Sequence, residues 1–294
     1  MKIVIAYDGS IQAGIAVDDL QWSGLPANTQ AIVLSVVEER IPTPESYFMV
    51  ETQFANQQVA VAKQWAEEGC SRLARHFPKW DIQMETQLGG VATAILNKAE
   101  AWTADLVVLG THGRSGLARV VLGSVALKLA HEAPCSVRVG RASKHPGPLR
   151  LLIGNDGSVE AAGAVDEVCT RSWPQGTEVQ VLAVHQMLRP FHPEAIVIDE
   201  ESYRKVDEQQ RLSLKHAAED SVEKLRHAGL NVSSVIQEGD PKEALAEAAK
   251  TWNADTIFIG ARGMGRVERL LLGSVSSAIV AHAPCSVEVV RRRG

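Results

Sequence analysis

Two glycine motifs contain the residues of this chain whose types and spacing are best suited to binding a ligand. The first comprises Gly110–Gly113 and, after a gap of nine residues, Gly123-Ser124. The second comprises Gly260–Gly263 and, after the same gap, Gly273-Ser274. Each motif follows an apolar run typical of a buried strand and opens an apolar-periodic helix. Such a strand, loop and helix N-terminus bring together backbone N–H groups that can hold phosphate.

The residue types within the motifs indicate what the glycines and the serine would do. Glycine is expected where the backbone needs a positive φ or where a ligand lies against the chain. Ser124 stands where the N-cap hydroxyl of a helix is expected.

An acidic residue ends the first apolar run of each half, Asp8 in the first and Asp156 in the second. These carboxylates would repel phosphate, so a ribose hydroxyl is their better partner. This arrangement places the sugar at the first strand and the phosphates at the glycine loop. The backbone near Val36, where the second strand ends, is then positioned to receive the base.

Ordinary turn chemistry is the alternative explanation for these glycines, because isolated glycines after strands usually make turns. The repeated spacing favours a function, although a duplicated scaffold would also keep its structural turns. Neither the lysine-containing phosphate loop nor the Rossmann glycine pattern after the first strand occurs. No metal-ligand spacing and no nucleophile–base set is found, so we assign no catalytic residue and no metal site. Any Mg²⁺ or Mn²⁺ is expected to arrive with a nucleotide and to be held mainly by its phosphates.

The elements that position these motifs alternate between strands and helices. In the first half we predict strands at Lys2–Tyr7, Ala31–Val37, Asp81–Leu88, Leu106–Leu109 and Ser136–Val139. Helices are predicted at Ile11–Trp22, Val50–His76, Val91–Trp102 and Ser124–Glu132, and the second half repeats this order. The alternation indicates an α/β fold, with a parallel sheet covered by helices on both faces. A strand order of 3-2-1-4-5 would place the ends of strands one and four at one crevice, where such sheets bind ligands.

The chain is a duplicated domain. Residues 87–139 align with residues 237–289 without a gap, and Asp8-Gly9-Ser10 aligns with Asp156-Gly157-Ser158. A short polar segment, Ser143–Pro148, separates the copies and is typical of a linker. We therefore expect two domains, at residues 1–142 and 149–294.

Composition limits the class of function. The 294 residues carry a net charge of −5, so no global basic field attracts nucleic acid. No run reaches the roughly 18 apolar residues that a membrane helix needs. Four cysteines without a Cys-x-x-Cys pair favour a reducing compartment, and we expect a cytoplasmic protein. Cys135 and Cys285 are expected to be buried as small apolar residues, and Arg291–Arg293 to form a solvated tail.

Both halves resemble the universal stress protein domain, in the subgroup marked by Gly-x2-Gly-x9-Gly-Ser/Thr that is associated with ATP binding. The resemblance rests on the Asp-Gly-Ser turn, the glycine loop beginning at Gly110, the Leu-Gly-Ser-Val at Leu122–Val125 and the closing Pro-Cys-Ser-Val strand. It covers nearly the whole chain and implies two tandem Rossmann-like domains with nucleotide across the crevice. The matching positions are Asp8, Val36, Gly110, Gly113, Gly123, Ser124 and Val125, then Asp156, Val184, Gly260, Gly263, Gly273, Ser274 and Val275.

The resemblance also implies a function and an assembly. We expect an ATP-binding regulatory or stress-response module, with adenine nucleotide in one or both crevices and no nucleic-acid or membrane partner. A slow ATP hydrolase, or a scaffold whose glycine loops are only structural, remains an alternative. The last strands, Val137–Val139 and Val287–Val289, are expected to pair within the chain, and a further homodimer stays open.

The two copies differ inside the loop. His112 of the first copy corresponds to Arg262, and Arg114 corresponds to Met264. Arg114 and Arg266 are candidates to touch phosphate, although solvated loop cations would give the same pattern. Equal affinity of the two sites is therefore not expected.

Overall fold

The computed structural model describes residues 1–38, 48–114, 122–142, 147–186, 200–263 and 272–292. The first half contains β1 (Lys2–Ala6), α1 (Ile11–Asp19), β2 (Gln30–Val37), α2 (Phe48–His76), β3 (Asp81–Leu88), α3 (Val91–Ala101), β4 (Leu106–Gly110), α4 (Ser124–Glu132) and β5 (Ser136–Gly140). The second half contains β6 (Arg150–Gly154), α5 (Val159–Thr170), β7 (Glu178–His185), α6 (Glu200–His227), β8 (Asn231–Glu238), α7 (Pro241–Thr251), β9 (Thr256–Gly260), α8 (Ser274–His282) and β10 (Ser286–Val290). A short 3₁₀ helix, Leu20–Trp22, continues α1.

All ten strands belong to one sheet, in the order β3-β2-β1-β4-β5-β10-β9-β6-β7-β8. Each half contributes five parallel strands in the order 3-2-1-4-5, which confirms the predicted fold class. The central strands β4, β5, β9 and β10 are almost wholly buried, whereas the edge strands β3 and β8 are largely exposed. The continuous apolar runs in the sequence therefore mark strands that are covered on both faces.

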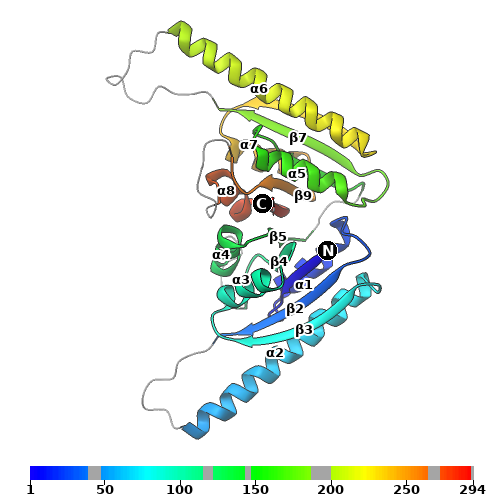
Figure 1. Cartoon of the computed structure of the whole chain (residues 1–294), viewed down its shortest axis with the longest axis vertical. Helices are drawn as coiled ribbons and strands as arrows, with labels where there is room; N and C mark the ends of the chain where they lie inside the picture. Colours follow the sequence, from blue (N-terminus) through cyan, green and yellow to red (C-terminus); the bar gives the residue numbers. More distant parts are fainter. Residues whose placement is uncertain (39–47, 115–121, 143–146, 187–199, 264–271, 293–294) are drawn as a thin grey trace, which may run out of the picture.

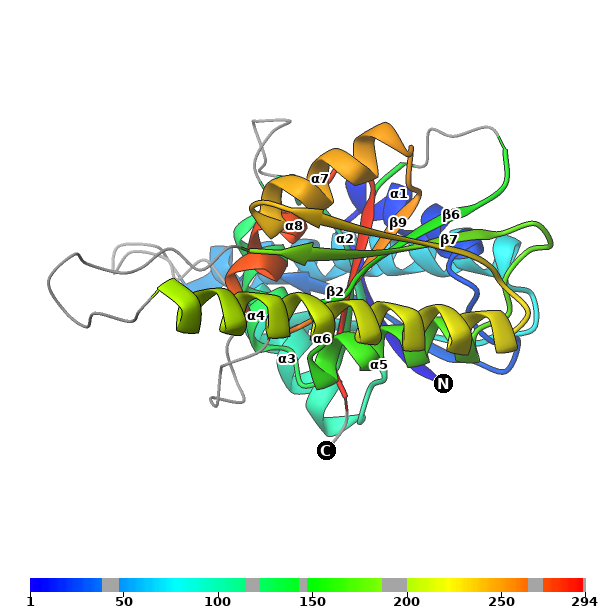
Figure 2. The ribbon, with the colours of Figure 1, turned by 90° about the horizontal axis from the view of Figure 1, so that it is seen from above.

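Helices cover both faces of the sheet in each half. In the first half, α1 and α2 pack on one face, and α3 and α4 pack on the other. The second half repeats this with α5 and α6 opposite α7 and α8; Figure 2 shows α6 and α7 on opposite sides of β7. Serine hydroxyls fix the start of the first helix of each half, because Ser10 and Ser158 accept hydrogen bonds from the amides of Ala13 and Ala161, each at 3.1 Å.

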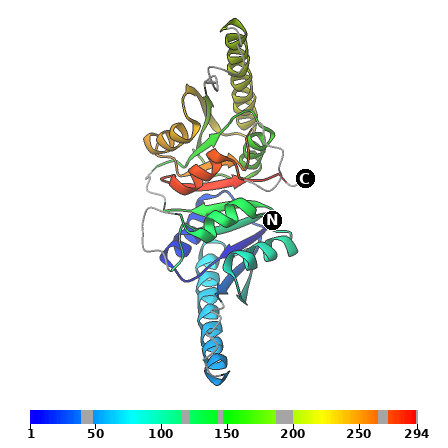
Figure 3. The same ribbon diagram turned by 90° about the vertical axis from the view of Figure 1, so that its left-hand side faces the viewer.

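The two halves meet at β5 and β10, which pair antiparallel at the centre of the sheet. The long helices α2 and α6 consequently lie at opposite ends of an elongated molecule (Figures 1 and 3). On one face a single apolar core runs beneath α3, α4, α7 and α8 across both halves. On the other face the apolar side chains form two separate cores, one in each half.

The structure also bears on the predictions for the two cysteines and for the C-terminal arginines. Cys135 and Cys285 are buried as expected, and burial raises the pKa of the Cys285 thiol to about 12. The solvated tail is wrong for Arg291, whereas Arg292 is exposed as expected. Arg291 Nη2 donates to the carbonyl oxygen of Ala130 at 2.6 Å, and Arg292 Nη2 pairs with Asp166 at 2.6 Å, because the end of β10 delivers them to neighbouring helices. Arg293 lies outside the described residues.

Candidate functional site

A cavity of about 610 Å³ opens at the carboxyl ends of β1 and β4 in the first half. All eight site residues predicted for this half line it: Asp8, Val36, Gly110, Gly113, Arg114, Gly123, Ser124 and Val125. They come from β2, β4, the segments that follow β1 and β4, and the start of α4. The structure thus brings the residues together at the crevice between β1 and β4. At this point the strand order reverses, and the helices that follow the two strands leave toward opposite faces of the sheet.

Asp8 ties the end of β1 to the glycine loop. Its Oδ1 atom accepts a hydrogen bond from the backbone amide of Ser10, and its Oδ2 atom accepts one from the amide of Arg114, both at 3.0 Å. The carboxylate is therefore held at the cavity wall by two backbone donors and is preorganised for a further hydroxyl donor.

The glycines serve close approach rather than a left-handed backbone. Gly110, Gly113 and Gly123 do not have positive φ, so that part of the expectation is wrong. A Cβ on Gly110 would lie 2.6 Å from the backbone of Gln12 in α1, and one on Gly113 would lie 2.8 Å from Asp8 Oδ2. Gly110 is accordingly required by packing, whereas Gly113 leaves room for the Asp8 carboxylate.

This difference gives a stability prediction. Gly110→Ala should lower the free energy of unfolding by about 1–3 kcal/mol, because the backbone of α1 cannot move away cheaply. Urea denaturation of the full chain measures the change. Gly90→Ala is the control, because its Cβ meets only Thr93 at 3.7 Å. An equal loss in both variants would contradict the packing argument.

The N-terminus of α4 lies at the cavity, which residues 123–126 line. Gly123, not Ser124, is the N-cap residue, and Gly123 has no side chain that could cap the helix. The predicted N-cap role of Ser124 is therefore wrong: the Gly123 amide bonds to the carbonyl oxygen of Thr111 at 2.8 Å, which makes Ser124 the first helical residue. An uncapped helix start keeps its orphan N–H groups available for an anion.

Sequence reasoning missed the other wall of the cavity. Trp65 of α2 lines it, and the Arg114 guanidinium lies 4.4 Å from the centre of the Trp65 ring. Leu34 and Val37 of β2, with Val91 and Ile95 of α3, add an apolar surface beside Val36. A weak signal existed in the sequence, since an aromatic residue within a helix that is otherwise rich in alanine and polar residues needs a partner.

The second crevice holds its predicted residues in corresponding places but with different neighbours. Gly260 ends β9, Gly273 is the N-cap of α8 and Ser274 its first residue, and Val184 lies near the end of β7. Val275 packs against the apolar core, and a Cβ on Gly263 would collide with Asp156 Oδ2. Arg266 lies outside the described residues.

The second crevice differs from the first in its charged residues. Arg262, which replaces His112, forms an ion pair with Glu160 in the first turn of α5, where the first half has Gln12. His185, which replaces Val37, is buried, and its Nε2 atom lies 3.2 Å from Asp207 Oδ1. The aromatic wall also differs: a Cβ on Gly9 would meet Trp65, whereas one on Gly157 would meet Ala217. The described residues at the second crevice are thus more polar than their counterparts in the first half.

The described residues also bear on other functions. No group of three or more His, Cys, Asp or Glu side chains among them is arranged to hold a metal ion. No helix within the same ranges combines the length and apolarity that crossing a membrane requires.

The fold and the crevice define a class: tandem doubly wound α/β domains joined through their last strands. The profile of the universal stress protein family matches residues 1–141 and again residues 149–291. A universal stress protein of Mycobacterium tuberculosis is 28% identical over 307 residues, covering 99% of this chain and 97% of its own length. A putative universal stress protein of Staphylococcus aureus is 38% identical over 149 residues, covering 49% of this chain and 86% of its own. The crystal structure of a universal stress protein from Archaeoglobus fulgidus superposes with a TM-score of 0.63 at 18% identity, covering 99% of this chain and 96% of that one.

The chain belongs to the universal stress protein family, with two copies of the family domain in tandem. This confirms the resemblance drawn from the glycine motifs.

Proposed function

We propose that this protein is an ATP-binding regulatory module and that the first-half crevice is its principal nucleotide site. The observation that supports this most is that one cavity gathers every site residue expected for that half. Its volume of about 610 Å³ suits a nucleotide, since small-molecule sites span roughly 300–1,000 Å³.

The chemistry of the walls orients the nucleotide. The phosphates face the uncapped start of α4 and the loop from Gly110 to Gly113, where amides and the helix dipole favour negative charge. Asp8 accepts from a ribose hydroxyl. The base lies against the apolar surface around Val36 and Val37. A Mg²⁺ or Mn²⁺ ion would enter with the nucleotide, held mainly by its phosphates.

The polar second crevice supports ranking the first half above it. Glu160 places a carboxylate beside the glycine loop and engages Arg262, which otherwise would attract phosphate. Buried His185 takes the place of an apolar wall residue, so an adenine there would lose apolar contact. We therefore expect tighter binding in the first half.

Mass spectrometry of the purified chain tests the proposal. Native spectra should show an adenine nucleotide carried through purification, or bound after addition of ATP, at one equivalent before any second. The absence of binding at millimolar ATP would contradict the proposal, as would a ligand of another chemical class at stoichiometric occupancy.

A fluorescence prediction follows from the contact between Arg114 and Trp65. Phosphate should draw the Arg114 guanidinium away from the Trp65 ring, so ATP should change the emission of the full chain. Trp65→Phe should abolish most of that change, and Arg114→Ala should weaken ATP affinity by roughly threefold to tenfold, as expected for an exposed charged contact. An ATP-dependent emission change that persists in Trp65→Phe would contradict this placement of the phosphates.

A further inference from the structure

The seam between the two halves has an approximate two-fold axis at Arg138 and Glu288. Antiparallel pairing places Val137 opposite Val289, Arg138 opposite Glu288 and Val139 opposite Val287. Because residue 138 of the first half corresponds to residue 288 of the second, each of these two residues faces its own counterpart. In any pairing of two like halves, the same position would face a copy of itself.

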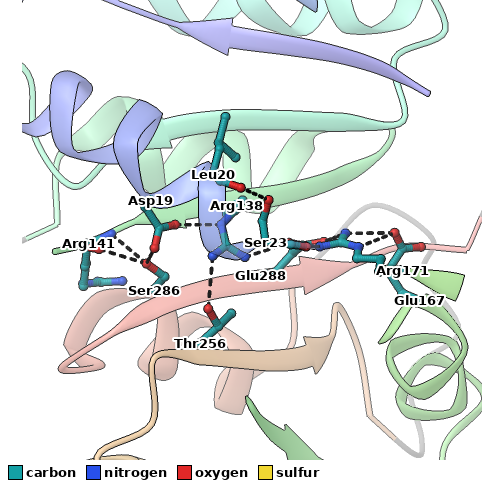
Figure 4. Close-up of polar contacts among 10 residues, drawn as sticks. All are labelled: Asp19, Leu20, Ser23, Arg138, Arg141, Glu167, Arg171, Thr256, Ser286 and Glu288. Carbon is teal, nitrogen blue, oxygen red and sulfur yellow. Dashed lines mark hydrogen bonds and ion pairs between the residues drawn. The ribbon is translucent and has the colours of Figure 1, made fainter. Parts of the chain in front are cut away.

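Arg138 and Glu288 carry opposite charges and are both completely buried. Arg138 Nη1 lies 3.1 Å from Glu288 Oε2, and Arg138 Nη2 donates to Thr256 Oγ1 at 3.0 Å (Figure 4). These side chains occupy the face of the sheet where the apolar cores of the two halves are separate. The seam is thus apolar on one face and ionic on the other.

Each half also supplies a counter-ion of its own. In the first half, Asp19 accepts from Arg138 Nε at 2.8 Å. In the second half, Arg171 forms an ion pair with Glu288 and another with Glu167, and its Nη1 atom donates to the carbonyl oxygen of Ser23 at 2.9 Å. Ser23 occupies the position in the first half that corresponds to Arg171, so the charges of the two halves have diverged.

Ser286 Oγ also donates to Asp19 Oδ1 at 2.8 Å, and Ser277 Oγ lies 3.3 Å from His131 Nε2 across the seam. A further set of contacts is the same from both sides. Arg141 Nη2 donates to the carbonyl oxygen of Val280, and Arg291 Nη2 donates to that of Ala130, both at 2.6 Å. The amides of these arginines donate to Ser286 and Ser136 at 2.9 and 3.1 Å. Since any two halves could make these contacts, they do not distinguish like from unlike pairs.

We propose that Arg138 and Glu288 make the edge-strand surface of each half selective, so that a first half binds a second half and rejects another first half. In a pair of first halves two guanidinium groups, each held by its own Asp19, would meet at the buried axis and neither would gain the carboxylate of Glu288. In a pair of second halves two carboxylates, each held by its own Arg171, would meet there without the guanidinium of Arg138. Juxtaposed like charges without solvent disfavour association strongly. The surface therefore fits one partner, the second half of this chain or of another copy of it.

Refolding of the nicked full chain tests the selectivity. A protease site is placed in the segment from residue 143 to residue 148, the folded chain is cleaved, and both halves are unfolded and refolded together. Random association would give twice as many mixed pairs as pairs of either like kind, as counted by native mass spectrometry. We expect the ratio of mixed pairs to pairs of either like kind to exceed the random ratio of two by at least about tenfold. A random distribution would overturn the proposal.

The matched control removes the charges at the axis. Arg138→Leu/Glu288→Leu should return the distribution to within about twofold of random, because it removes both charges that meet at the axis. Asp19 and Arg171 keep their contacts with Ser286 and Glu167 in this variant. Undiminished selectivity in this variant would overturn the proposal, since other residues would then choose the partner. If the double variant does not refold, Glu288→Gln replaces it. Pairs of second halves should then rise by at least about fivefold over the wild type, and an unchanged share would count against the proposal.

Discussion

Glu288→Ala is expected to lower the free energy of unfolding of the full chain by about 3–5 kcal/mol. The substitution leaves the buried guanidinium groups of Arg138 and Arg171 without the carboxylate that both engage. Urea denaturation measures the change. Glu201→Ala is the matched control, because the exposed pair of Glu201 with Lys205 should contribute less than about 0.5 kcal/mol. A loss below about 1 kcal/mol for Glu288→Ala would contradict the role assigned to the seam.

The carboxyl group of Glu288 also makes the stability of the seam depend on pH. Burial alone would raise the pKa of Glu288, but the attraction of Arg171 and Arg138 outweighs burial and holds the pKa below the ordinary value of 4.5. The stability it contributes is therefore present above pH 4.5 and is lost as the pH falls toward the lowered pKa. Asp19 acts in the opposite sense, because burial raises its pKa despite Arg138.

The pH effect is measured as the difference in free energy of unfolding between the wild type and Glu288→Ala. The stability of the wild type minus that of Glu288→Ala should be constant above about pH 5.5 and should shrink as the pH falls below 4.5. Carboxyl groups away from the seam cancel in this difference, whereas Asp19 does not, because Glu288 contributes to raising the pKa of Asp19. A difference that grows on acidification would contradict the direction of the pKa shift.

Ser124→Pro is expected to weaken ATP binding roughly 10- to 100-fold while leaving the fold intact. Proline is well accepted at the first helical position, and the preceding Gly123 already has the extended backbone that proline requires, with φ −63° and ψ 149°. The substitution removes one amide donor and one hydroxyl from the proposed phosphate site, and charge-assisted bonds of this kind contribute about 1.5–3 kcal/mol.

Two matched variants separate the contributions at this site. Ser124→Ala removes only the hydroxyl and should cost less affinity than Ser124→Pro. Ser274→Pro makes the same change in the second half, where Gly273 is also extended, and should leave the tighter binding event unchanged. Calorimetric titration with ATP provides all three affinities. Equal losses in Ser124→Pro and Ser274→Pro would contradict the ranking of the two crevices.

The fold could be predicted from the sequence because the duplication, the alternation of elements and the buried strands all indicate one architecture. Helix and strand ends were predicted to within a few residues, as the bounds of α2 and β3 illustrate. The misplaced N-cap at Ser124 has a local cause: the extended backbone of Gly123, which no hydrophobic pattern records, moves the cap back by one residue. Arg291 was misjudged because its partners lie in α4, far away in the sequence.

The glycines of the candidate site could be predicted from the sequence, because their role depends on the local backbone and on the absence of a side chain. Trp65 was missed because its partner Arg114 lies on a distant loop and its counterpart in the second half is not aromatic. The charge pair at the seam left a readable signal, Val-Arg-Val at 137–139 against Val-Glu-Val at 287–289. A charge between two buried valines in each closing strand indicates a buried partner, and only the pairing of the strands shows that the two charges are partners.

A crystal structure of the full chain grown with ATP and Mg²⁺ would test the central claim most directly. The account predicts nucleotide in the first-half crevice, with its phosphates at the N-terminus of α4, its ribose at Asp8 and its base beside Val36. A first-half crevice that stays empty at saturating ATP, or one whose nucleotide turns its phosphates away from Ser124, would contradict it.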